Sequence, residues 1–141
     1  MDLRERFRES FATKAAKVKT GIPSTTNWHG TRNLIAEQVG VEPEDVYVTT
    51  ISKPENVSVR FFQSKAVFRA SLLIAMHTDA PATVPGTVRA LREIAVEREV
   101  SAAVATIEDG KWSVVEILSQ PGDEAAEELA RCYPEATVVS I

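Results

Sequence analysis

The chain has few of the residues on which most catalytic and metal sites depend. Its 141 residues include one cysteine and two histidines, and its six glycines are scattered singly. A single cysteine cannot form an internal disulfide, which suits a reducing compartment. Two histidines fall short of the nitrogen and sulfur ligands that a zinc site usually draws on, and no glycine-rich phosphate loop is present. The sequence therefore predicts no catalytic residue, no metal site and no cofactor.

Long hydrophobic runs are also missing from the sequence. No segment approaches the roughly 20 apolar residues of a membrane-spanning helix, and the N-terminus lacks the apolar core of a secretory signal. With 44% hydrophobic and 26% charged residues, the composition is typical of a globular protein. We therefore expect a cytoplasmic protein with no membrane partner and no signal peptide.

Charge is distributed unevenly along the chain. The net charge of −4 combines +3 over residues 1–20 with −7 over the rest. In the first segment the apolar residues recur at steps of three and four, which is typical of an amphipathic helix: Leu3, Phe7, Phe11, Ala15 and Val18. Gly21 and Pro23 are suited to end it. We expect a basic helical arm over residues 1–22 and a single α+β domain over residues 23–141.

Periodicity and turn residues predict the elements of that domain. Helices are expected from Thr31 to a stop at Gly40, over Gly86–Glu99, and after Asp123. Strands are expected over Val46–Ile51, as a hairpin-like pair over Val57–Thr78, as a hairpin turning at Asp109 and Gly110, and over Thr137–Ile141. This order predicts an α+β fold, with an antiparallel or mixed sheet of five to six strands and helices mainly on one face.

The expected strand pair over Val57–Thr78 predicts which of its side chains face the core. Apolar residues alternate along it, so Phe61 and Phe68 are expected in the core, with Arg60 and Arg69 on strand faces. The opposite face of the second strand is mixed rather than polar. Such a face is half covered, and a neighbouring subunit is one candidate for the cover.

One loop offers a candidate ligand site. Trp28, His29 and Gly30 stand just before the expected helix start, where free backbone amides could hold an anion. The alternative is that Trp28 fills the edge of a core or an interface. His77, at the end of a strand, is expected to have a structural or surface role.

Nucleic-acid binding is the second functional class that the sequence leaves open. The basic N-terminal helix, Arg32, Arg60 and Arg69 would meet phosphates, and Phe62 is the candidate for stacking on a base. The chain has a net negative charge and no dense basic run, which favours a function other than nucleic-acid binding.

A homo-oligomeric structural protein accounts for more of these features. Oppositely charged ends of one chain can fix the register of a head-to-tail contact between copies. The residues expected at such an interface are Leu3, Phe7, Phe11, Trp28, Arg60 and Arg69.

The order of elements over residues 31–118 resembles that of the tail-terminator proteins of tailed phages. It comprises a helix, the strand Val46–Ile51, the strand pair, a proline-containing link, a helix and the hairpin. The N-terminal arm and the last helix and strand depart from that pattern, which leaves other head-tail connector proteins in view. The resemblance implies a ring in a virion that caps a tail tube, has other proteins of the assembly as partners, and catalyses nothing.

Overall fold

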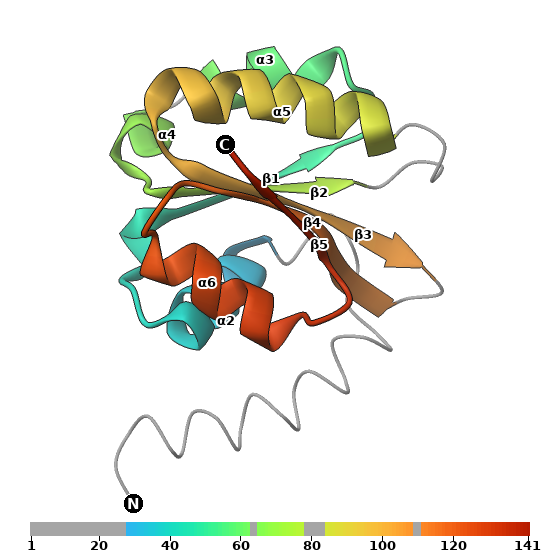
Figure 1. Cartoon of the computed structure of the whole chain (residues 1–141). Coiled ribbons are helices and arrows are strands. Elements are labelled where there is room, and N and C mark those ends of the chain that lie inside the picture. Colours follow the sequence, from blue (N-terminus) through green and yellow to red (C-terminus); the bar gives the residue numbers. More distant parts are fainter. Residues whose placement is uncertain (1–27, 63–64, 78–83, 109–110) are drawn as a thin grey trace, which may run out of the picture.

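A five-stranded mixed sheet lies at the centre of the protein (Figure 1). The structure is a computed structural model and describes residues 28–62, 65–77, 84–108 and 111–141. In sheet order the strands are β1 (Val46–Ile51), β2 (Leu72–His77), β3 (Ser101–Glu108), β4 (Lys111–Ser119) and β5 (Thr137–Ser140). Strands β1, β2 and β3 are parallel, β4 is antiparallel to β3, and β5 is parallel to β4. The predicted α+β fold with a mixed sheet is confirmed, whereas the arm over residues 1–22 lies outside the described residues.

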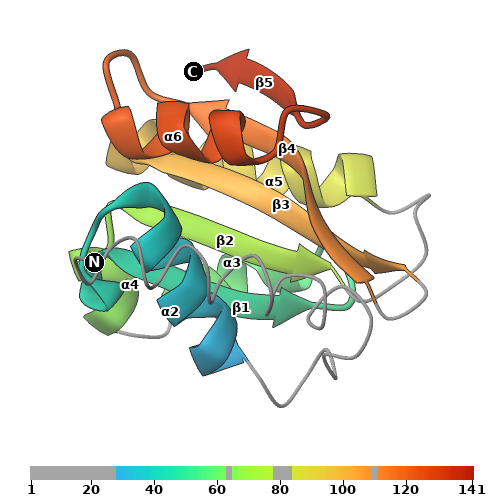
Figure 2. The same cartoon turned by 90° about the horizontal axis from the view of Figure 1, so that it is seen from below.

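Helices cover both faces of this sheet. On one face lie α2 (Trp28–Val39) and α6 (Glu124–Cys132), and on the other lie α3 (Asn56–Phe62), α4 (Lys65–Arg69) and α5 (Val84–Arg98) (Figures 1 and 2). A short 3-10 turn, η1 (Pro43–Asp45), joins α2 to β1. The expectation of helices mainly on one face is therefore wrong. None of the helices in the described ranges is long and apolar enough to cross a membrane.

The central strand β2 shows why both faces need cover. All six of its residues are buried. Leu72, Ile74 and Met76 pack toward α2 and α6, while Leu73 and Ala75 pack toward α3, α4 and α5. A parallel strand with helices on both sides reads as a continuous apolar run, not as an alternation. The second face of this strand is thus covered by the chain's own helices and not by a neighbouring subunit.

The first half of the predicted strand pair is helical. Val57 and Phe61 in α3 are fully buried, whereas Val59 between them is 52% exposed. A strand would place all three on one face, but on a helix only the residues four apart share a side. Because β1 and β2 are parallel, the chain must cross from the end of one to the start of the other, and α3 and α4 form that connection.

The second half of that pair is helical as far as Arg69. Val67 in α4 and Ala70 just after it are buried three residues apart, while Phe68 is exposed. The strand β2 therefore begins at Leu72, several residues later than predicted. The strand pair in the tail-terminator resemblance is thus replaced by two helices and one strand.

The remaining predicted elements are present. The strand Val46–Ile51, the antiparallel pair β3 and β4, the helices α5 and α6 and the last strand are confirmed. The turn at Asp109 and Gly110 lies outside the described residues. Helix α2 ends at Val39, and Gly40 follows with φ +79°, a left-handed conformation that glycine adopts without strain.

A β-bulge divides the β3–β4 hairpin. The pairing passes from Val104 with Glu116 to Ala105 with Val114, so Val115 is an extra residue on β4. Side chains on β4 change faces at this point. Val114 and Ile117 both pack toward α2 and α6 although they are three positions apart in sequence, because their partners on β3, Ala105 and Ala103, are only two positions apart.

The cap of α6 provides a first test of the fold. One carboxylate oxygen of Asp123 accepts a hydrogen bond from the Ala125 backbone N–H at 3.0 Å. Asp123→Ala removes this acceptor and should lower the free energy of unfolding by about 0.5–2 kcal/mol in urea titrations. Asp123→Asn keeps an acceptor and should lower the free energy of unfolding much less. Equal losses in the two variants would show that the cap does not act through this hydrogen bond.

Candidate functional site

The structure separates the residues predicted for an interface. Arg60 lies in the last turn of α3 and Arg69 in the last turn of α4, and both are exposed on the same side of the sheet. They are on helices and not on strand faces as predicted. Trp28 begins α2 on the opposite side, and its side chain is outside the described part, as is that of Phe62. Leu3, Phe7 and Phe11 lie outside the described residues.

The predicted anion site falls within a helix and not in a loop before it. Helix α2 begins at Trp28, three residues before Thr31, so His29 and Gly30 belong to its first turn. Gly30 is exposed, with open space where a Cβ would project. First-turn amides have no partner within their own helix, so the backbone remains suited to an anion, and the site stays a prediction. His77 is buried at the end of β2, which fits a structural role.

Phe68 is the residue whose placement differs most from its predicted role. Its side chain is 66% exposed, although the alternating pattern placed it in the core. The guanidinium carbon of Arg98 on α5 lies 4.1 Å from the ring centroid, which is a cation–π contact. The spacing of Val67 and Ala70 was the signal that a helix, and not a strand, carries this ring.

Helices α3, α4 and α5 together form what we call the basic layer. Of their charged residues only Glu93 and Glu97 are acidic. Six are basic: Arg60, Lys65, Arg69, Arg89, Arg92 and Arg98. Among the described residues, four large hydrophobic side chains are exposed, and three of them belong to this layer: Val59, Phe68 and Val96. The basic layer therefore combines a net positive charge with three exposed hydrophobic side chains.

The opposite side of the sheet carries the reverse charge. Helices α2 and α6 on that side, together with the turn η1, which contacts both α2 and α4, form what we call the acidic layer, in which only Arg32 and Arg131 are basic. Its acidic residues number six: Glu37, Glu44, Asp45, Glu124, Glu127 and Glu128. The two helical layers of this domain are thus oppositely charged.

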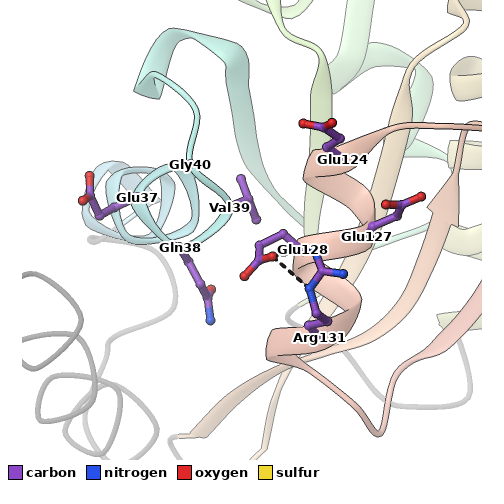
Figure 3. A pocket seen from close by; sticks show the side chains of 8 residues that line it. All are labelled: Glu37, Gln38, Val39, Gly40, Glu124, Glu127, Glu128 and Arg131. Carbon is purple, nitrogen blue, oxygen red and sulfur yellow. Dashed lines mark hydrogen bonds and ion pairs between the residues drawn. The ribbon is translucent and has the colours of Figure 1, made fainter. Parts of the chain in front are cut away.

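A pocket of about 310 Å³ opens in the acidic layer where the end of α2 meets α6 (Figure 3). It is lined by residues 37–39 of α2, by Gly40 just after that helix, and by Glu124, Glu127, Glu128 and Arg131 of α6. Arg131 is already engaged, because its guanidinium donates two hydrogen bonds to one carboxylate oxygen of Glu128, at 2.7 and 2.9 Å. The remaining glutamates leave the pocket with an acidic lining.

A second, smaller group of acids continues this lining. An adjoining pocket shares Glu37 and Gly40 and adds Glu42 and Asp45. The backbone carbonyls at the end of α2 also carry partial negative charge. The surface from η1 to α6 is therefore suited to a cationic partner.

Two pKa shifts belong to this layer. The hydrogen bonds that Arg131 donates to the Glu128 carboxylate raise the pKa of this guanidinium. Burial raises the pKa of the Tyr133 hydroxyl, just after α6, because the low-dielectric core disfavours a phenolate. Tyr133 is accordingly a neutral packing residue beneath the acidic layer.

Candidate metal ligands do not gather in the described ranges. No three histidine, cysteine, aspartate or glutamate residues lie together there in a way that could hold a metal ion. The acids of the two pockets line a surface instead of converging on one point.

No protein-family model, curated protein or solved structure matches the chain. A function for this protein is therefore best sought in the two charged layers and the ring of Phe68.

Proposed function

We propose that the chain is a non-enzymatic assembly subunit that binds further copies of itself through the basic layer. The observation that carries this proposal is the exposed ring of Phe68, held against Arg98 and flanked in sequence by Arg69. Aromatic and arginine side chains are the residue types that contribute most to binding energy at protein interfaces.

The contact with Arg98 also prepares Phe68 for binding. A side chain that is ordered before association loses less conformational entropy when a partner covers it. The guanidinium carbon of Arg98 lies over the Phe68 ring, 4.1 Å from the ring centroid, and this contact restricts the ring. Val59 and Val96 are further exposed hydrophobic side chains of the same layer. Phe68 is thus the candidate for the apolar centre of a small interface, with arginines of the layer as its charged rim.

Copies related by such a contact can close into a ring when the rotation between them closes. A ring that caps a tail tube or joins it to a phage head is one assembly of this kind. The support for self-association comes from the surface of the basic layer and does not depend on the tail-terminator resemblance.

Light scattering on a sizing column tests the proposal. Over a wide concentration range the wild-type chain should give a discrete oligomer, and Phe68→Ser should shift it to the monomer mass. Val138→Ser is the matched control, because Val138 is 51% exposed but lies on β5, outside the basic layer. A wild-type chain that remains monomeric at every concentration, with or without added salt, would overturn the proposal.

A nucleic-acid-binding module is the alternative that one observation favours. Bases stack on exposed aromatic rings, and Phe68 stands among arginines in the basic layer. That alternative predicts a monomer that binds a labelled oligonucleotide with an affinity that falls steeply with salt concentration. Phe68→Ser and Arg69→Glu would both weaken that binding, whereas the assembly proposal predicts no such binding.

A further inference from the structure

The charges of the two helical layers indicate which surface of a second copy the basic layer meets. Helices α2 and α6 lie on the opposite face of the sheet from helices α3, α4 and α5 (Figures 1 and 2), although the turn η1 of the acidic layer contacts α4 of the basic layer. One layer has six basic and two acidic residues, and the other has six acidic and two basic residues. Two basic layers facing each other would bring like charges together, which costs binding energy.

We infer that the basic layer of one copy docks on the acidic layer of the next, with Phe68 and Arg69 seated against the α2–α6 pocket. This inference depends on the proposed function and adds the partner surface to it. Opposite net charge favours this contact, and the pocket lined by Glu37, Glu124 and Glu127 provides a concave acidic surface for the exposed Phe68 and Arg69.

The internal ion pair of the pocket fits this arrangement. Arg131 is bound to Glu128, so the basic group of the lining already has its carboxylate partner. Glu124 and Glu127 on the same helix are exposed to solvent. Incoming arginines of another copy would therefore meet carboxylates at the rim of the pocket without displacing Arg131.

The contact is head-to-tail, which decides the form of the assembly. Each copy uses two different surfaces, so every docked pair still presents one free basic layer and one free acidic layer. Such a contact forms either a closed ring or an open filament. A contact between two identical patches would stop at a dimer instead.

A complementation experiment with full-length variants tests the inference. The first variant, Phe68→Ser with Arg69→Glu, disables the basic layer and keeps the acidic layer. The second, Glu37→Lys with Glu127→Lys, disables the acidic layer and keeps the basic layer. Each should be a monomer by light scattering, and an equimolar mixture should give a 1:1 species of twice the monomer mass that grows no further.

The charge change itself needs a control. Glu55→Lys with Glu135→Lys alters the net charge as much as the second variant does, at exposed positions outside both layers. This control should assemble as the wild type does. Far-ultraviolet circular dichroism and thermal unfolding would establish that all variants fold, which is expected because the substituted side chains are exposed or only partly buried.

The outcomes separate the inference from the proposed function. One outcome is that the variant Glu37→Lys with Glu127→Lys assembles as the wild type does, while the variant Phe68→Ser with Arg69→Glu is a monomer. The basic layer would then bind a different surface, so the inference would fail and the proposed function would stand. If both variants are monomers but their mixture stays monomeric, the inference also fails. A wild type that is always monomeric overturns the proposed function, and the inference with it.

Discussion

Lysine in place of Leu73 or of Ile74 is expected to destabilise the protein by more than about 4 kcal/mol, because either change buries an unpaired charge. The two side chains point to opposite faces of β2, and both are fully buried, one under α5 and the other under α2. A domain of this size has a total stability of roughly 5–15 kcal/mol, so both variants should be largely unfolded or close to it. Urea titration followed by circular dichroism measures the loss.

Ser71→Lys is the matched control for these two variants. Ser71 directly precedes β2 and is exposed, so a lysine there should change the free energy of unfolding by less than about 1 kcal/mol. A sheet with helices on one face would tolerate lysine on its open side. If Leu73→Lys were as stable as Ser71→Lys, the cover of the α5 face described above would be wrong.

Phe61→Ala should be the second most damaging change, with a loss of about 3–5 kcal/mol in the free energy of unfolding. The Phe61 ring is fully buried in the core between the sheet and helices α3–α5. It packs edge-on against Tyr47 of β1, with ring centroids 5.6 Å apart and planes at 66°. The Tyr47 hydroxyl donates a hydrogen bond to the Arg60 carbonyl at 3.2 Å, which ties the same turn of α3 to the strand. Removing the ring would leave a cavity at the junction of α3 and β1.

Phe68→Ala provides the comparison within the same connection between β1 and β2. Phe68 is 66% exposed, so its removal should cost less than about 1 kcal/mol when both variants are measured at concentrations where the chain is monomeric. Dilution matters because self-association would otherwise add to the apparent stability. Equal losses for Phe61→Ala and Phe68→Ala would support the strand that the sequence pattern predicted, in which both rings face the core.

Phe68 also shows how stability and assembly can be distinguished. Its ring contributes little to the folded monomer but stands at the centre of the proposed contact, whereas Phe61 contributes to folding and is inaccessible to a partner. A variant at position 68 that folds normally but fails to assemble therefore reports on binding. A variant at position 61 cannot do so, because any loss of assembly would follow from unfolding.

Part of the candidate site could be predicted from sequence. Arg60 and Arg69 were predicted at an interface, and the structure places both, exposed, on one side of the sheet. The exposure of Phe68 was missed because its neighbours fit both the helical and the strand spacing. The acidic layer combines residues near 37, 45 and 127, and no local pattern links these segments until the sheet brings α2 and α6 together.

The sequence by itself determined those elements in which the spacing of apolar residues fits either a helix or a strand, but not both. The helix over α5, the β3–β4 hairpin, the last strand and the α6 helix with its Asp123 cap follow from local residues, because spacing, turn residues and capping agree there. Only the tertiary structure decided residues 57–62 and 65–70. Valine and phenylalanine at alternate positions suit a strand, and Val57 with Phe61 equally suits a helix. The parallel pairing of β1 with β2 requires a crossover, and packing against the sheet therefore selected the helices and left Phe68 exposed.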